Sequence, residues 1–231
     1  MTDDRTRNLQ RTLAQLQARY GDRVIAPARR AEIAPLPTGF ADLDAQIGGG
    51  LWPGRLSVLI GQPTSGATSL ALRILANAQR AGAPVLVVDL PRQFDPHLAG
   101  RLGVDAGALV LSRPAAADAV VAIVREALEN AALGAVLLDA ADAKLAAGSA
   151  DVRRLSQSLM GSPAALLVLS SPNVPSTLDG LIDVRLRVER LAWVRRGLDV
   201  TGLTVRVLID RDHTGGGGRA VQIEIRYGED Q

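Results

Sequence analysis

The chain has 231 residues, of which 47% are hydrophobic and 22% charged, and its formal net charge is +2. This length and composition predict a globular chain with one main domain and exclude a disordered one. There is no cysteine, which excludes disulfides and thiolate metal sites, and the two histidines, His97 and His213, are too far apart in sequence to predict a metal site. No apolar stretch is long enough to span a membrane and the polar start is unlike a signal peptide, so we expect a cytoplasmic protein with no membrane partner.

An exposed amphipathic helix is predicted over residues 3–20. Its apolar face is formed by four side chains, Leu9, Leu13, Leu16 and Tyr20. Gly21 ends the helix, residues 23–26 are a candidate short strand, and a linker with proline and arginine follows over 27–37. An apolar face on a separate arm requires a surface to cover it. We expect that surface on the chain's own domain or on a neighbouring subunit.

A phosphate-binding loop is predicted at residues 61–69, which read Gly-Gln-Pro-Thr-Ser-Gly-Ala-Thr-Ser. Gly61 and Gly66 have the spacing that lets a backbone wrap a phosphate chain, and the hydroxyl of Thr68 suits magnesium. An apolar run before the loop predicts a buried strand, and a helical apolar period follows it. Ala67, however, stands where such loops carry the lysine that holds the β- and γ-phosphates. The pattern predicts a nucleotide scaffold without its central cation, and an ordinary strand-to-helix turn is the alternative.

Strands and helices alternate along the middle of the chain. The predicted strands are 56–60, 84–89, 108–111, 134–139 and 164–170, and the predicted helices between them are 67–81, 95–102, 115–131 and 149–160. This order predicts an α/β fold with a mostly parallel sheet and helices on both faces. After Pro172 the pattern changes to two-residue alternation, which predicts an antiparallel extension with strands at 182–190, 202–210 and 220–227. The glycine run 215–218 is interpreted as a hairpin spacer.

With these elements in place, the chain resembles the RecA recombinase family over nearly its whole length. The segments that carry the resemblance are 37–44 (PTGFADLD), 48–55 (GGGLWPGR), the loop, 94–105 (FDPHLAGRLGVD), 136–139 (VLLD) and 226–229 (RYGE). The resemblance implies a RecA-like P-loop core over residues 34–231. It also implies that residues 1–33, a helix–strand arm with its linker, are an oligomerisation arm that packs on the next protomer.

The departures from the family's pattern carry the functional prediction. The glutamate that activates water in the family falls near Pro91, and the glutamine that senses the γ-phosphate falls near 171–173. The family's adenine-stacking tyrosine corresponds to Leu98. Loss of the lysine and of the base each removes about 10²-fold or more in rate. We therefore expect no catalytic residues and no cofactor, and any binding of ATP and magnesium should be weak.

A vestigial nucleotide site remains in the prediction, with Asp95 as an adenine partner and Asp139 as a magnesium partner through water. Its members are Gly61, Thr64, Ser65, Gly66, Ala67, Thr68, Ser69, Asp95 and Asp139. Acidic residues also commonly end parallel strands because strand ends meet solvent, which is the alternative for Asp139. Arg211, with His213 beside it, corresponds to the strand end from which the family supplies a cation to a neighbour's phosphates.

The segments that bind DNA in the family are shorter in this sequence. The connections that correspond to the family's DNA-binding loops, 140–151 and 172–180, are short, and the second lacks basic residues. Four arginines are candidate phosphate contacts, namely Arg153, Arg154, Arg185 and Arg187. A solvated charged face is the alternative for them.

A shortened RecA core with a damaged loop is similar to the ImuA family, RecA-like accessory proteins of damage-induced mutagenesis. The resemblance rests on segments 65–69 (SGATS) and 103–110 (GVDAGALV). The leading hypothesis is a non-catalytic adaptor that docks on RecA, on other RecA-like protomers or on polymerase-like mutagenesis proteins. The alternatives are an atypical RecA-type, DNA-dependent ATPase or recombinase with a substitute cation, and a DNA-binding module without nucleotide chemistry.

Overall fold

The computed structural model describes residues 34–140, 148–171 and 176–228. The chain divides into two units, Met1–Ile33 and Ala34–Gln231, and the fold described below is that of the second. The predicted arm residues Leu9, Leu13, Leu16 and Tyr20 lie outside the described residues, as do parts of both connections expected to correspond to DNA-binding loops.

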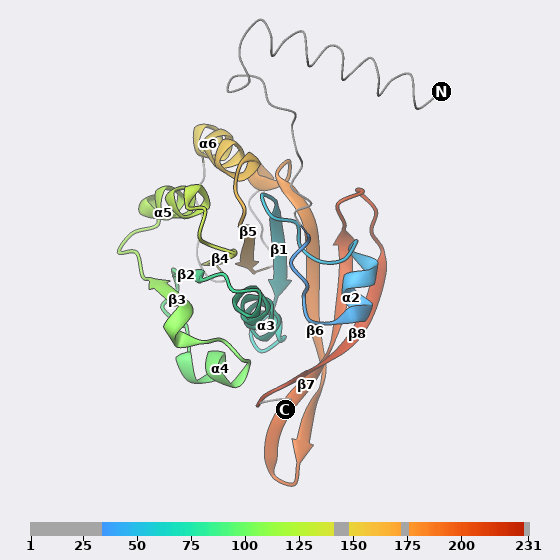
Figure 1. The fold of residues 1–231 in the computed structure, drawn as a ribbon. Helices are drawn as coiled ribbons and strands as arrows, with labels where there is room; N and C mark the ends of the chain where they lie inside the picture. Colours follow the sequence, from blue (N-terminus) through green and yellow to red (C-terminus); the bar gives the residue numbers. More distant parts are fainter. Residues whose placement is uncertain (1–33, 141–147, 172–175, 229–231) are drawn as a thin grey trace, which may run out of the picture. The chain divides into compact units, whose positions relative to one another are not determined.

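The core of the second unit is one eight-stranded sheet (Figure 1). Its spatial order is β3 (Leu109–Ser112), β2 (Val85–Asp89), β4 (Ala135–Ala140), β5 (Ala165–Ser170), β1 (Leu56–Gly61), β6 (Ile182–Arg196), β7 (Asp199–Arg211) and β8 (Arg219–Arg226). The first six strands are mutually parallel, and β7 and β8 continue the sheet in antiparallel fashion. The predicted α/β fold with a mostly parallel sheet and an antiparallel C-terminal extension is therefore confirmed.

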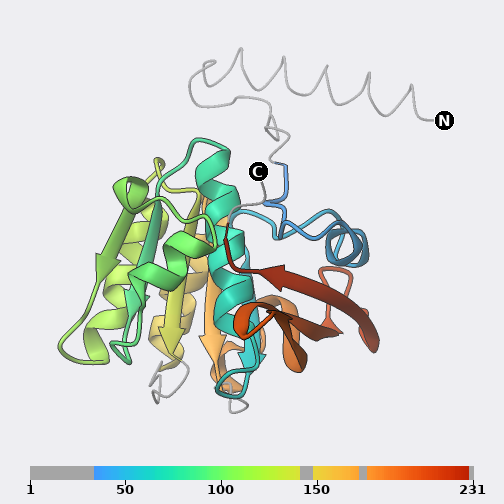
Figure 2. The ribbon, with the colours of Figure 1, turned by 90° about the horizontal axis from the view of Figure 1, so that it is seen from below.

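Helices cover both faces of the sheet. They are α2 (Ala41–Gln46), α3 (Ala67–Arg80), α4 (Pro96–Arg101), α5 (Asp118–Glu129) and α6 (Ser149–Met160), with short 3₁₀ turns at Ala106–Ala108 and Ser176–Leu178. The apolar side chains of α2, α3 and α4 join one buried cluster with one sheet face, and those of α5 and α6 join a second cluster on the opposite face. Figure 2 shows α3 lying along its face of the sheet. Within the described residues, no helix is both long and apolar enough to cross a membrane.

The central strands are buried on both faces, which explains why their sequences are continuous apolar runs. Every residue of β2 and β5 is buried, and in β1 only the final Gly61 is partly exposed. Because these strands run parallel, the carboxyl ends of β1, β2, β4 and β5 lie along one edge of the sheet. In open parallel sheets this edge is where ligands bind.

The C-terminal part differs from the prediction in two respects. Strand β6 pairs with β1 in parallel, so it belongs to the parallel sheet as well as to the antiparallel extension. It also continues beyond the expected end at residue 190 to Arg196, where it forms a long hairpin with β7 that projects beyond the sheet (Figure 1). The hairpin closes in two residues, Gly197 with φ 63° and the fully exposed Leu198, a geometry that needs glycine at the first turn position.

Candidate functional site at the degenerate phosphate loop

The predicted loop joins β1 to α3 at the carboxyl edge of the sheet, where a phosphate-binding loop requires it. Gly66 forms the N-cap of α3 with φ 97°, and a Cβ atom at this position would lie 2.5 Å from Leu203 Cδ1 and 2.8 Å from Val205 Cγ1. Gly61 is equally constrained, because a Cβ atom there would overlap Ser65 Oγ. Packing alone therefore requires glycine at both positions, whether or not a phosphate binds.

Residues of the loop form hydrogen bonds with one another. The Ser65 amide donates to the Gln62 carbonyl at 3.0 Å, and the Ala67 amide donates to Ser65 Oγ at 3.3 Å. The Ser65 side chain is buried and occupies the inside of the turn. Two of the amides that could face an anion therefore already have partners within the loop.

Position 67 brings no charge to the loop. Ala67 is 8% exposed and packs in the main apolar cluster, whereas Thr68 is exposed and Ser69 is buried. The methyl group of Ala67 cannot donate a hydrogen bond or neutralise a phosphate. The predicted strand, loop and helix are present, and the effect of Ala67 on nucleotide binding stays a prediction.

The cation that reaches the loop is Arg190, which the sequence reasoning did not identify. Its Nη1 donates to the Thr64 carbonyl at 2.9 Å, and its guanidinium carbon lies 4.4 Å from the centre of the Trp193 ring. The parallel register pairs Gly61 with Val188, so Arg190 follows two residues past the end of β1. That pairing joins residues far apart in the chain, so no local sequence spacing indicates it.

Arg211 and His213 lie towards the opposite end of the sheet from the loop. Arg211 pairs in register with Arg185, which is itself opposite Val58 near the start of β1, and its Nη1 donates to the Asp179 carbonyl at 3.3 Å. The His213 ring packs against Gly48 and lies 6.4 Å from the Trp52 ring. Neither side chain reaches the loop of its own chain, and their role towards a neighbouring protomer stays a prediction.

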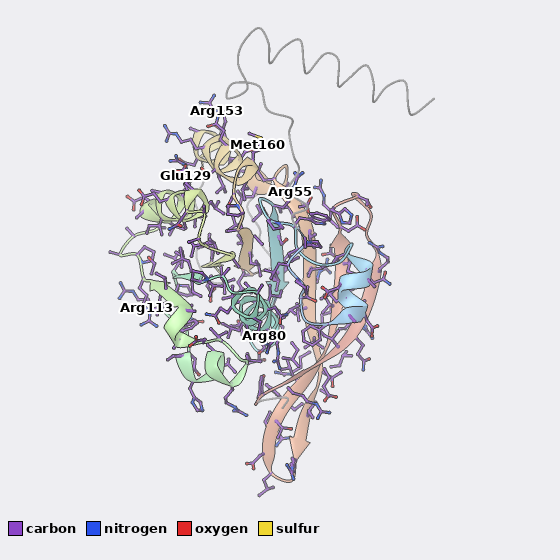
Figure 3. The ribbon with its side chains drawn as sticks, viewed as in Figure 1. Arg55, Arg80, Arg113, Glu129, Arg153 and Met160 are labelled. Atoms are coloured by element: carbon purple, nitrogen blue, oxygen red, sulfur yellow. The ribbon has the colours of Figure 1, made fainter. Side chains whose placement is uncertain are left out.

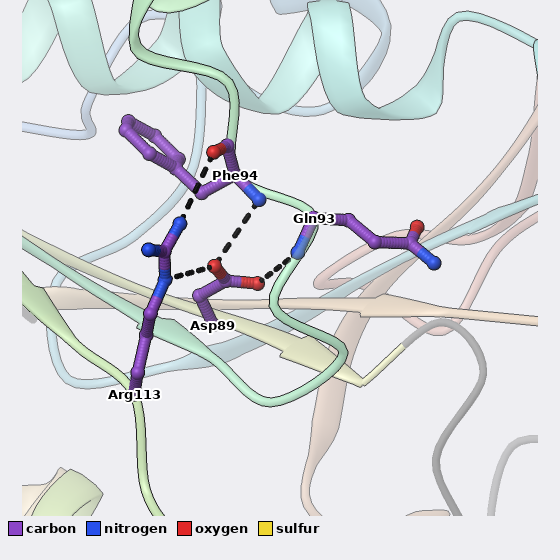
Figure 4. A network of polar contacts seen from close by, with 4 residues as sticks. All are labelled: Asp89, Gln93, Phe94 and Arg113. Carbon is purple, nitrogen blue, oxygen red and sulfur yellow. Dashed lines mark hydrogen bonds and ion pairs between the residues drawn. The ribbon is translucent and has the colours of Figure 1, made fainter.

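Asp89, at the end of β2, is an anchor for the connection that follows it (Figure 4). Its carboxylate is fully buried and accepts hydrogen bonds from the Gln93 amide at 2.8 Å, the Phe94 amide at 3.1 Å and Arg113 Nε at 2.9 Å. Arg113 also donates to the Phe94 carbonyl at 3.3 Å. These bonds occupy both carboxylate oxygens and hold the segment that contains Pro91, where the resemblance expects a catalytic glutamate.

The other predicted nucleotide contacts lie at the same edge. Asp139 is the register partner of Asp89 across β2 and β4, and its side chain is partly exposed. Asp95 Oδ1 caps the start of α4 by accepting from the amides of His97 and Leu98 at 2.8 and 3.2 Å. This capping role accounts for Asp95 without an adenine. Leu98 is half-buried against the main apolar cluster.

Three of the four arginines predicted to contact DNA lie close to carboxylates of the same chain. Arg154 lies 3.8 Å from Asp151, and Arg187 lies 2.7 Å from Asp210. Arg185 pairs with Asp179, and its Nε is buried without a partner. Arg153 is exposed and projects from α6 away from the sheet (Figure 3). Among the described residues, no three side chains are grouped as metal ligands.

Comparison with known proteins gives one consistent relationship. Residues 7–170 match the family model of the RecA N-terminal domain. The chain is 28% identical to Protein RecA of Streptomyces ambofaciens, in an alignment that covers 98% of this chain and 70% of the relative. It is 27% identical to Protein RecA of Frankia casuarinae, with 97% and 76% covered, and 26% identical to that of Clavibacter michiganensis subsp. michiganensis, with 97% and 72% covered.

Proposed function

The chain belongs to the RecA N-terminal domain family, and from that premise we propose that it is a non-catalytic, cytoplasmic RecA-like accessory protein of DNA repair, recombination or damage-induced translesion mutagenesis. It acts by docking on RecA, on another RecA-like protomer or on a polymerase complex, in the manner of the ImuA family. The observation that carries the proposal is the buried methyl group of Ala67 where the loop needs a cation.

The chemistry of phosphoryl transfer supports the absence of turnover. Catalysis of that reaction consists of positioning and charge stabilisation, so an uncharged residue 67 removes its largest contribution. Asp89, at the end of β2, cannot substitute for the missing base, because it is fully buried and both its oxygens already accept hydrogen bonds. Pro91, in turn, has no group that can orient water.

The open edge of the sheet supports docking. Among the described strands, β3 is at one end of the order and pairs with β2 alone, so its outer backbone groups are available to a further strand. It also exposes two apolar side chains, Val110 at 54% and Leu111 at 39%. An exposed apolar edge is a template for strand addition. The arm of a RecA-like protomer, or the arm of a second copy of this chain, is the occupant that we propose.

The docking proposal is tested by co-sedimentation with RecA filaments. We expect Val110→Lys to weaken co-sedimentation about ten-fold, because a lysine on an edge strand opposes the addition of a further strand. Leu198→Lys, at the hairpin tip, makes the same chemical change at a residue that is 95% exposed and should leave binding unchanged. Equal binding by all three proteins would refute docking at this edge. A deletion of residues 1–33 that binds as well as the full chain would remove the arm from the mechanism.

An atypical ATPase is the second candidate, and the contact between Arg190 and the Thr64 carbonyl favours it. A guanidinium at the loop can supply the positive charge that Ala67 lacks. Calorimetric titration with ATP and magnesium separates the two functions: tight binding with phosphate release that is lost in Arg190→Gln supports the enzyme. No heat and no phosphate release support the adaptor. Ala67→Lys should raise ATP affinity if the loop geometry is competent.

A further inference from the structure

The β6–β7 hairpin continues past the end of β1 and leaves one backbone edge open. Strand β6 pairs with β1 only as far as Val188, which lies opposite Gly61. From Glu189 to Arg196 it pairs with β7 alone, in the part of the hairpin that projects from the sheet (Figure 1). Among the described strands, none lies on the other side of residues 190–196. Their outer N–H and C=O groups are therefore available to a further strand.

Exposed apolar side chains are concentrated on this hairpin. Among the described residues, six large apolar side chains are exposed, and three of them lie within eight consecutive positions here: Leu191 at 43%, Trp193 at 40% and Leu198 at 95%. Single exposed apolar residues are ordinary in globular proteins, whereas a group of them marks an interaction surface. Arg195 and Arg196 are exposed in the same segment. Tryptophan and arginine are among the residues most enriched at the energetic centres of protein interfaces.

Trp193 is held in place at the border of the buried core. It lies opposite Leu203, which is only 1% exposed. The guanidinium carbon of Arg190 lies 4.4 Å from the centre of the indole ring, and Arg190 Nη1 donates to the Thr64 carbonyl at 2.9 Å. A side chain that is positioned before binding loses less conformational entropy when a partner arrives. The indole is therefore a preorganised anchor.

The stacking of Arg190 on the indole does not account for the whole surface. A cation–π contact is an ordinary way to cover an exposed ring, yet Trp193 keeps 40% of its surface exposed. The contact also involves a single apolar side chain, whereas the exposed apolar surface extends from Leu191 to Leu198 at the tip. A partner that covers this surface would bury more apolar area than the intramolecular contact does.

The charge of the hairpin favours an acidic occupant. Residues 190–199 contain three arginines and one acidic residue, Asp199, which gives a net charge of +2. In the part of the chain that the structure describes, neither Arg195 nor Arg196 forms an ion pair, although Asp199 is the register partner of Arg196. Guanidinium groups bind carboxylates through paired, charge-assisted hydrogen bonds. Carboxylates on a partner would therefore complement the two arginines.

The arm of the chain does not fit this charge. Residues 1–33 contain seven arginines and four acidic residues, which gives a net charge of +3. The arm of a second copy carries the same charge, and like charges brought together at an interface are unfavourable. The occupant that complements the hairpin is therefore a segment of a different protein, in which acidic residues accompany apolar ones.

We propose that the hairpin is a docking surface for an extended acidic segment of a partner protein. The segment adds as a strand along residues 190–196, its apolar side chains contact Leu191 and Trp193, and its carboxylates bind Arg195 and Arg196. In this mode of recognition main-chain hydrogen bonds give affinity and alternate side chains give specificity. Four strands separate β6 from β3 in the sheet, so failure of this proposal would leave the docking proposal at β3 unaffected.

The test follows the fluorescence of Trp193 while the full chain is titrated with a short synthetic peptide in which glutamate alternates with valine. The chain has two tryptophans, so the titration uses a Trp52→Phe background; Trp52 Nε1 has no hydrogen-bond partner among the described residues, and its loss leaves no acceptor unpaired. We expect a saturable blue shift of the emission, because the added strand removes the indole from water. A peptide with lysine in place of glutamate should produce no shift.

Arginine variants test the role of charge in the same titration. Arg195→Gln/Arg196→Gln should weaken binding of the glutamate–valine peptide at least ten-fold, because each arginine supplies charge-assisted hydrogen bonds. The matched control is Arg92→Gln/Arg101→Gln, which removes the same charge from exposed positions after β2 and in α4 and should bind as the unaltered arginines do. Equal weakening in both pairs, equal binding of the two peptides, or no binding at all would overturn the proposal.

A second measurement needs no variant. In hydrogen exchange of the unaltered chain, the glutamate–valine peptide should slow exchange at those amides of residues 190–196 that β7 does not pair, and leave residues 109–112 of β3 unchanged. Protection confined to β3 would assign the peptide to the other open edge and overturn the proposal. Protection of the hairpin by an oligothymidylate but not by the peptide would also overturn it, because the surface would then recognise nucleic acid.

Discussion

The buried Asp89 carboxylate should contribute more to stability through the backbone than through its ion pair. Its three hydrogen bonds come from two backbone amides and from Arg113. The side chain of Arg113 is 42% exposed, so water solvates it when the pair is broken. The two amides, in contrast, belong to a connection that has to turn at the end of β2, and Asp89 fixes that turn.

The substitution Asp89→Asn keeps the volume but retains at most one good acceptor, and its amide group faces a donor. Hydrogen bonds to a charged group contribute about 1.5–3 kcal/mol each, so we expect a loss of about 3–5 kcal/mol in the free energy of unfolding. Arg113→Gln removes one of these three hydrogen bonds and leaves both amide bonds in place, so it should cost less, about 1.5–3 kcal/mol. Urea unfolding of both variants and of the double variant measures the difference. An Arg113→Gln variant as unstable as Asp89→Asn would contradict this prediction, because the ion pair would then be the anchor.

Three further predictions concern stability. Hydrogen bonds from Thr214 hold the pKa of Asp212 well below its usual range. The stabilising contribution of Asp212 is therefore present above about pH 4 and is lost on acidification. In Asp212→Asn the melting temperature should fall less steeply as the pH is lowered, and an unchanged acid dependence would contradict this. Burial raises the pKa of Asp183, so its ionisation opposes folding as the pH rises, and Asp183→Asn should raise the melting temperature at neutral pH but not at pH 3. Gly66→Ala should lower the free energy of unfolding in urea by about 2–4 kcal/mol, because the new methyl group both strains the backbone and lies too close to Leu203. Gly82→Ala is the control, because φ there is 88° but the space around it is open, and it should lower the free energy of unfolding by only about 1 kcal/mol.

The sheet could be predicted from the sequence because its strands are bounded by local signals. Strands β1, β2, β4 and β5 are buried runs between turn residues, and their observed limits lie within one residue of the expected ones. Helix α2 was missed because it is only six residues long and buries one side chain, Leu43, which is too little periodicity to detect. The extension of β6 was missed because Leu191 and Trp193 are exposed and give no two-residue pattern of burial.

The site was only partly predictable because its polar contacts join residues far apart in the chain. The loop and its missing lysine could be found from nine consecutive residues. The contact between Arg190 and Thr64 spans 126 positions and depends on the pairing of β6 with β1. The anchoring contact of Asp89 with Arg113 joins residues 24 positions apart, and Arg113 directly follows the edge strand β3. Neither separation has a signature in local spacing.

In the loop region, the positions that keep the family's residue have roles in the fold, whereas the altered positions belong to the phosphate chemistry of the family. Gly61 and Gly66 are constrained by neighbouring side chains, Asp95 caps a helix, and Asp89 holds a turn. Each of these four would be needed in a protein that never bound a nucleotide. Positions 67 and 91, which in the resemblance serve phosphate chemistry, carry alanine and proline. Retention of these four residues is therefore not by itself evidence for nucleotide turnover.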